Sequence, residues 1–230
     1  MNSVMCVACG NKTLKSYSWL SLSNHQDFLC GHCQNKLQRL KPPLCRKCHR
    51  MLSELPAEFV QGEMCYDCVR WEKWGGSLEK NMSLYVYNDY CKELMALFKY
   101  RGDYAIANIF AKDVHAALAE LEVDYIVPIP LSGERLQERG FNQSEAFIQT
   151  ARLSAHNLLT RIHSEKQSKK SRQKRLNQAD IFQIQTNFPI ENKKIVLVDD
   201  IYTTGSTLQL AAQTLAEAGA SHIISFTIAR

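Results

Sequence analysis

The stretch covering residues 194–207 constrains the fold of this chain more than any other. It opens with the apolar run 195–198, passes through Asp199 and Asp200, and continues into small polar residues. An apolar run without polar alternation indicates a strand that is covered on both faces. The helical spacing that follows places on one face Leu208, Ala211, Ala212 and Leu215. A strand, a tight turn and a helix in this order predict a parallel α/β sheet.

The turn after this strand has the composition of a phosphate-binding loop. Backbone N–H groups converge at a helix N-terminus, and hydroxyl groups there add further donors. The two acids lie where open α/β sheets bind ligands, and they can accept hydrogen bonds from sugar hydroxyls or hold magnesium. The strand, the acid pair and the turn resemble the phosphoribosyl-pyrophosphate (PRPP) motif of type I phosphoribosyltransferases, through Asp199, Asp200, Thr203, Thr204, Gly205, Ser206 and Thr207.

Eight of the nine cysteines fall into four Cys-x-x-Cys pairs. The first two pairs are separated by 20 residues and the last two by 16, which matches the spacing of tetrahedral zinc sites. The N-terminal residues lack the pattern of a secretion signal, so we expect a reducing, cytoplasmic compartment and metal rather than disulfides. We predict two structural zinc ions, with sequential or interleaved pairing left open, on Cys6, Cys9, Cys30, Cys33, Cys45, Cys48, Cys65 and Cys68.

The chain divides at a glycine-rich joint after residue 74. Residues 1–74 are expected to form a zinc-binding module, a double zinc ribbon, and residues 80–230 an α/β domain. A length of 230 residues suits one such domain with a small appendage. Because no stretch approaches the roughly 20 apolar residues of a membrane span, we expect no membrane insertion.

Two groups of basic residues suggest contacts with polyanions. In the zinc module, basic residues alternate with aromatic ones, as suits single-stranded nucleic acid; the alternative is that Trp71 and Trp74 pack against the next domain. The second group lies in the polar segment 163–178, which we interpret as a mobile lid. The lid candidates are Lys166, Lys169, Lys170, Arg172, Lys174 and Arg175, and the basic residues of the module are Arg39, Lys41, Arg46, Lys47, Arg50, Arg70 and Lys73.

Taken together, these segments resemble the ComF family of late competence proteins almost from end to end. The segments that carry the resemblance are the four cysteine pairs, residues 98–103, 127–132 and 139–143, Lys166-Gln167, Arg175 with Asn177, and the PRPP motif. The resemblance implies a cytoplasmic bacterial protein of natural transformation. Such a protein would handle incoming single-stranded DNA alongside the competence helicase and other DNA-processing proteins.

The resemblance also implies roles for single residues. Asp199 and Asp200 would take the ribose hydroxyls of PRPP, directly or through magnesium, and residues 203–207 would wrap its 5-phosphate. Arg135 and Arg139 lie one helical turn apart, so both could face its pyrophosphate or remain solvated. Further candidates for the same anion are Lys99 and Arg101.

One position departs from a well-known pattern of the type I enzymes. Purine-salvage relatives place an acid three residues after the second aspartate, whereas this chain has Thr203 there. No general base is therefore identifiable, and two hypotheses follow. The chain is a DNA-binding competence protein whose PRPP site senses a ligand or is a relic, or it is an active magnesium-dependent phosphoribosyltransferase. The acceptor in the second case would be a nucleotide, an amine or a DNA-linked group.

Overall fold

The main sheet of the protein is parallel and has β9 in its interior. The computed structural model describes residues 3–14, 28–73, 75–162, 181–185 and 188–230. Within these residues the main sheet has the strand order β5 (Asn81–Tyr85), β10 (His222–Ala229), β9 (Lys194–Ile201) and β6 (Tyr125–Pro128). Every neighbouring pair in this sheet is parallel. The structure thus confirms that the stretch identified first in the sequence is a central parallel strand.

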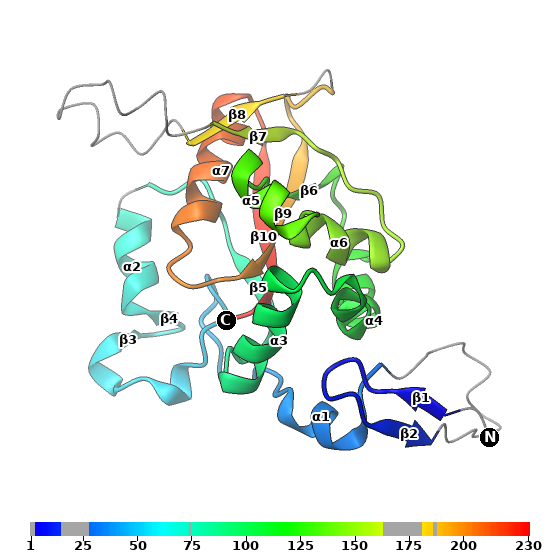
Figure 1. Ribbon diagram of the computed structural model, residues 1–230. Helices are drawn as coiled ribbons and strands as arrows, with labels where there is room; N and C mark the ends of the chain where they lie inside the picture. The colour runs from blue at the N-terminus through cyan, green and yellow to red at the C-terminus, as the bar shows by residue number, and fades with distance from the viewer. Residues whose placement is uncertain (1–2, 15–27, 74, 163–180, 186–187) are drawn as a thin grey trace.

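Both faces of β9 are covered by hydrophobic side chains. Ile195 and Leu197 belong to one core together with α7 (Ser206–Glu217), and Val196 and Val198 belong to the other. The second core includes residues of α3 (Asp89–Tyr100), α4 (Ala107–Leu118) and α6 (Gln143–Thr150). Figure 1 shows α7 on one side of the sheet and α4 and α6 on the other. The buried face of α7 is the one that the spacing predicted, Leu208, Ala211, Ala212 and Leu215.

The two cysteine-rich units lie apart from each other. The first contains β1 (Ser3–Met5), β2 (Lys12–Leu14) and α1 (Gly31–Lys36), and the second contains η1 (Leu52–Glu54), η2 (Ala57–Phe59), β3 (Val60–Gln61), β4 (Met64–Cys65) and α2 (Tyr66–Lys73). Figure 1 shows the first unit, in blue, below α4, and the second, in cyan, on the other side of the molecule. The four cysteines of the second unit share a core with β9 and α7. The segment 1–74 therefore contains two separate units, and the second is packed into the α/β domain.

Smaller elements surround the carboxyl edge of the sheet. The helix α5 (Gly133–Arg139) follows β6, and the short helix η3 (Tyr104–Ile106) precedes α4. The strands β7 (Leu159–Arg161) and β8 (Phe182–Ile184) form a separate antiparallel pair. The predicted lid between them, with its candidates Lys166 to Arg175, lies outside the described residues. Among the described helices none is both long and apolar enough to cross a membrane.

Aromatic packing fixes the end of α3. The ring of Phe98 is fully buried, and its centroid lies 5.0 Å from that of Phe147 and 5.3 Å from that of Phe141. Phe141 and Phe147 belong to the segment that leads into and forms α6. This contact holds the last turn of α3, and with it Lys99, at a fixed place beside the sheet.

We predict that Phe98→Ala lowers the free energy of unfolding by about 3–5 kcal/mol, because it removes a buried ring and leaves a cavity. Tyr100 is 78% exposed on the same helical turn and provides the matched control. Tyr100→Ala should change stability by only about 0.5 kcal/mol. Urea unfolding of the two variants measures the difference, and equal effects would contradict this account of α3.

Candidate ligand site and metal centres

The acid pair at the end of β9 is held in place by hydrogen bonds. The backbone N–H of Asp200 donates to Oδ1 of Asp199 at 2.9 Å, and the hydroxyl of Ser144 donates to the same oxygen at 3.2 Å. Ser144 belongs to the first turn of α6, whose N-terminus is capped by the side chain of Asn142. Sequence reasoning missed Ser144 because its partner is 55 residues away.

Lys99 forms an ion pair with Asp200. The side chains are 18% and 13% exposed, so both charges are largely removed from water. The sequence suggested Lys99 as a contact for a ligand's pyrophosphate, and in the structure its ammonium group compensates the second acid of the pair. A close ion pair of this kind is costly to break from one side only, because the remaining charge is then buried alone.

Asp199 has an unusual protonation equilibrium. Burial raises its pKa from 3.8 to about 7, and the negative charge of Asp200 adds to this rise. The hydrogen bond from the backbone of Asp200, the charge of Lys99 and the hydroxyl of Ser144 act in the opposite direction. The two acids therefore differ in role, since Asp200 is paired with a cation and Asp199 can gain or lose a proton near neutral pH.

The predicted phosphate loop forms the start of α7. Gly205 has φ 79° and ψ 0°, a left-handed conformation, and a Cβ atom there would lie 2.2 Å from the hydroxyl of Tyr202. Only glycine fits this position. The hydroxyls of Thr204 and Ser206 are 2.9 Å apart, and Thr203 and Thr204 are exposed. The loop thus presents hydroxyls and the N-terminus of a 12-residue helix on its open side.

Several arginines lie around the carboxyl edge of the sheet. Arg135 and Arg139 both belong to α5, as predicted, and Arg139 donates to the side chain of Gln143 at 2.8 Å. A Cβ atom on Gly102 would lie 3.7 Å from the backbone oxygen of Arg139, which places the exposed Arg101 near the end of α5. These contacts bring the predicted cations to the same side of the sheet as the acid pair.

Arg161 is a residue that sequence reasoning missed. It lies half-buried on β7, with its guanidinium carbon 5.7 Å from the ring centroid of Phe182. Burial lowers the pKa of Arg161, the positive charge of Arg135 adds to this effect, and the charge of Asp199 opposes it. Arg161 is therefore in electrostatic range of both residues. Nothing in its local sequence signals this, because the placement depends on the pairing of β7 with β8.

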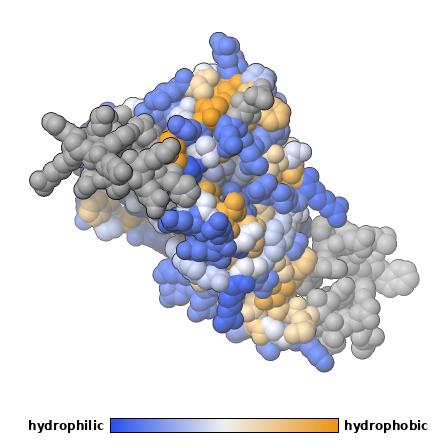
Figure 2. All heavy atoms as spheres, turned by 45° about the horizontal axis from the view of Figure 1, so that its top comes forward, coloured by the Kyte–Doolittle hydropathy of each residue, from blue (hydrophilic) through white to orange (hydrophobic). Residues whose placement is uncertain are grey.

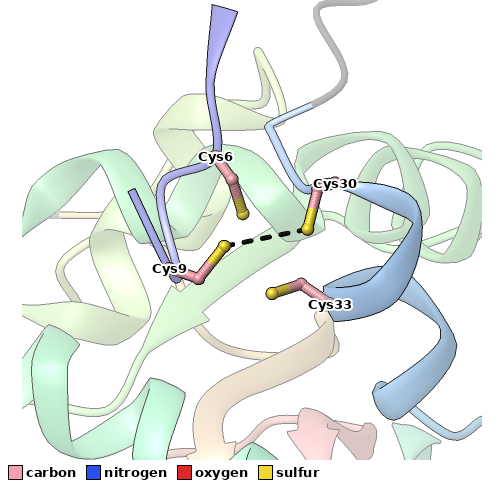
Figure 3. Close-up of side chains that lie close together, drawn as sticks. All are labelled: Cys6, Cys9, Cys30 and Cys33. Carbon is pink, nitrogen blue, oxygen red and sulfur yellow. Dashed lines mark hydrogen bonds between the residues drawn. The ribbon is translucent and has the colours of Figure 1, made fainter. Parts of the chain in front are cut away.

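The eight paired cysteines form two groups in sequential order. Figure 3 shows the side chains of Cys6, Cys9, Cys30 and Cys33 pointing toward one another, with sulfurs of Cys9 and Cys30 3.7 Å apart. In each group the four sulfur atoms lie within 4.8 Å of one another. Four converging thiols suit a tetrahedral metal site. The second group, Cys45, Cys48, Cys65 and Cys68, is fully buried. The structure decides the pairing that the spacing left open.

Many basic residues of the cysteine units have acidic partners. Arg46 and Lys47 contact Glu72 at 3.6 and 3.3 Å. Arg50 pairs with Asp67 at 2.9 Å, and Arg39 pairs with Asp113. These cations are less available to a polyanion than the sequence suggested.

An aromatic side chain of the second cysteine unit faces the α/β domain. Trp71 lines a pocket together with Tyr202 and Gln209, so it lies between this unit and α7. This position favours the packing interpretation for Trp71, whereas Trp74 lies outside the described residues.

Figure 2, which turns the β7–β8 end of the molecule toward the viewer, shows hydrophobic residues scattered among hydrophilic ones.

Comparison with known proteins gives full-length matches. The "Competence protein ComFC" of Bacillus subtilis (strain 168) is 36% identical over 100% of this chain and 96% of that protein. The ComFC protein of Streptococcus pneumoniae (strain ATCC BAA-255 / R6) is 33% identical over 98% and 99%. "Competence protein F" of Haemophilus influenzae (strain ATCC 51907 / DSM 11121 / KW20 / Rd) is 26% identical over 91% and 100%. This chain belongs to the ComFC family.

The same comparisons confirm the fold class. The family model described as "Phosphoribosyl transferase domain" matches residues 107–230. These residues include β6, β9, β10 and the acid pair, so the α/β part is a phosphoribosyltransferase domain of the parallel-sheet type. A solved hypoxanthine phosphoribosyltransferase from Staphylococcus aureus is 17% identical over 54% of this chain and 62% of that one, with a TM-score of 0.33. That likeness is too low to support any argument, and the fold class rests on the family model and the sheet.

We predict that Asp199→Asn stabilises the protein increasingly as the pH rises. Between its ordinary pKa of 3.8 and its folded pKa of about 7, the folded protein keeps a proton that the unfolded chain has released. The wild type therefore loses stability over this range, and the loss is complete above about pH 7. The asparagine variant escapes this loss and can still accept both hydrogen bonds.

Thermal unfolding of the two proteins from pH 5 to pH 8 measures this effect. The difference in Tm should grow with pH and level off above about pH 7, by about 2–4 °C for each kcal/mol gained. A difference that does not change with pH would show that Asp199 is already ionised at pH 5.

Proposed function

We propose that this chain is a competence protein of natural transformation that handles incoming single-stranded DNA in the cytoplasm and binds PRPP. The observation that carries the proposal is the combination of full-length likeness to ComFC proteins with an acid pair and a phosphate loop at one edge of the sheet. The partners that this role requires are single-stranded DNA, the competence helicase and other DNA-processing proteins.

The geometry of the edge supports PRPP as the ligand. Asp199 and Asp200 can accept the ribose hydroxyls, while the residues 203–207 offer hydroxyls and a helix N-terminus to the 5-phosphate. Arg135, Arg139 and Arg161 supply positive charge for the diphosphate. Among the described residues, no acidic side chain forms an ion pair with Arg135 or Arg161.

Magnesium is compatible with this acid pair through the oxygens that are not already engaged. Oδ1 of Asp199 takes two hydrogen bonds and Oδ2 of Asp200 pairs with Lys99. An ion that arrives with PRPP would be held by the carboxylates of Asp199 and Asp200, and it would neutralise charge on the diphosphate.

We predict that Asp199→Asn combined with Asp200→Asn lowers the affinity for magnesium–PRPP beyond detection by calorimetry. The two carboxylates are the proposed acceptors for the ribose hydroxyls, directly or through magnesium. Asp124→Asn is the matched control, because Asp124 binds Lys193 and the backbone of Lys194 at the amino end of β9. Unchanged affinity in the double variant would refute the site.

For DNA, the segment 163–178 is a stronger candidate than the cysteine units. Arg39, Arg46, Lys47 and Arg50 have acidic partners in the structure. The segment offers six cations between Lys166 and Arg175, more than one diphosphate needs. Phosphate contacts of a single strand release counterions, so binding should weaken with salt.

We predict that Lys169→Ala, Lys170→Ala and Arg172→Ala together flatten the salt dependence of single-strand binding. The slope of log K against log salt should fall by about 2 if all three cations contact phosphates. The matched triple variant Arg46→Ala, Lys47→Ala and Arg50→Ala should leave the slope nearly unchanged. The reverse result, measured by fluorescence anisotropy of an oligonucleotide, would move the DNA surface to the second cysteine unit.

A second candidate function is phosphoribosyl transfer from PRPP to a nucleotide, an amine or a DNA-linked acceptor. The intact acid pair and the glycine that the loop geometry requires favour it. Thr203 in place of an acid leaves the attacking group without an identified base. Release of pyrophosphate on addition of an acceptor would establish this activity, whereas binding without release would favour ligand sensing.

We propose zinc as the metal of both cysteine groups, because four thiolates form a closed tetrahedral site of the kind that zinc occupies. We predict two zinc ions per chain by elemental analysis. Cys9→Ser and Cys65→Ser should each lose one ion, but Cys65→Ser should be the more destabilising, because Cys65 is fully buried in the main core and Cys9 is exposed. Equal losses of stability would contradict the integration of the second unit into the domain.

A further inference from the structure

The side chain of Arg230 is half-buried, with two of its nitrogens turned away from water. Its Nε and Nη1 atoms are inaccessible to water and have no hydrogen-bond partner among the described residues. Figure 1 shows the end of β10 arriving beside β4, which carries part of the second cysteine group. A buried guanidinium group needs a compensating negative charge nearby.

The second cysteine group can supply that charge. Four thiolates around a divalent ion leave a net negative centre. The guanidinium group of Arg230 lies over the ring of Tyr202, and Tyr202 shares a core with all four cysteines of this group. The guanidinium group is therefore placed beside the thiols.

Arg230 also contacts Tyr202, the residue that directly precedes the phosphate loop. Its guanidinium carbon lies 4.6 Å from the ring centroid of Tyr202, within the range of a cation–π contact. Tyr202 is 6% exposed and belongs to the same core as the four cysteines. Its hydroxyl is so close to Gly205 that no Cβ atom fits between them.

A second contact links the same two parts of the molecule. The backbone N–H of Leu78, just after the cysteine unit, donates to Oε1 of Gln209 at 3.4 Å. Gly76 lies so close to Gln209 that a Cβ atom there would be 2.6 Å from the same oxygen. Gln209 belongs to the first turn of α7, directly after the phosphate loop.

We propose that Arg230 is a positioning residue that serves as the counter-ion of the metal-loaded second cysteine group and holds Tyr202 against the phosphate loop. The second metal centre then supports the loop from its rear side, through a cation and a stacked ring. The first cysteine group has no such role, because it packs against α3 and α4. This link between the metal centre and the phosphate loop exists whether or not PRPP is the ligand.

The first test measures metal retention in the full, metal-loaded chain. A chelator should remove the two ions in separate phases. Arg230→Met should accelerate metal release from the second cysteine group by about 10–100-fold and leave release from the first group unchanged. This factor matches the loss of metal affinity that usually follows when a partner next to the ligands is removed. Lys112→Met, which removes an exposed charge from α4, should behave as wild type. Wild-type release from Arg230→Met would overturn the proposal.

The second test measures the phosphate loop directly and needs no ligand. Amide hydrogen exchange in residues 202–208 should be faster in Arg230→Met than in the wild type and unchanged in Lys112→Met. Because this experiment contains no PRPP, a negative result would count against the role of Arg230 and not against the proposed function. Unchanged exchange in Arg230→Met would exclude the link between the metal centre and the loop.

If Arg230→Met does not fold, Arg230→Lys takes its place. Lysine keeps the positive charge but lacks the planar face that stacks on Tyr202. Metal release should then stay close to wild type while exchange in residues 202–208 increases. Exchange as slow as in the wild type would contradict the proposed positioning of Tyr202.

Discussion

Burial of β9 on both faces is the constraint on which the rest of this structure depends. Ile195 and Leu197 enter one core and Val196 and Val198 the other, so any shift of the strand would disturb both. The strand can therefore end in only one place, and this place sets the position of Asp199, Asp200 and the loop into α7. The second cysteine group is part of the first of these cores, which makes it a component of the domain rather than an appendage.

Electrostatic interactions then give the two acids at the end of the strand different protonation states. Two adjacent acids in a largely buried setting cannot both carry uncompensated charge. Lys99 compensates the charge of Asp200, and the pKa of Asp199, raised by burial to about 7, leaves that acid partly protonated near neutral pH. The helix α3 is thus tied to the ligand site through Lys99, and the packing of Phe98 keeps it there. A ligand that brings hydroxyl donors and a cation would enter a site whose charges are already nearly balanced.

The sequence predicted the parts of the site that are local along the chain. The apolar run, the acid pair and the glycine turn are continuous, and their geometry follows from the strand–turn–helix order. Cysteine spacing likewise predicted the two groups of four converging thiols. Contacts between distant segments could not be predicted, because they depend on how helices pack: Ser144 with Asp199, Lys99 with Asp200, and Arg161 near Arg135. The ion pairs that engage the basic residues of the cysteine units belong to the same class.

The measurement that tests the central claim most directly is calorimetric titration of the purified chain with magnesium–PRPP, with and without saturating single-stranded DNA. The account predicts that PRPP binds and that DNA changes its affinity, because the segment 163–178, interpreted from the sequence as a lid over the PRPP site, is also the proposed DNA contact. If PRPP binds in neither condition, the acid pair and loop are a retained scaffold, and the claim of a PRPP site is wrong.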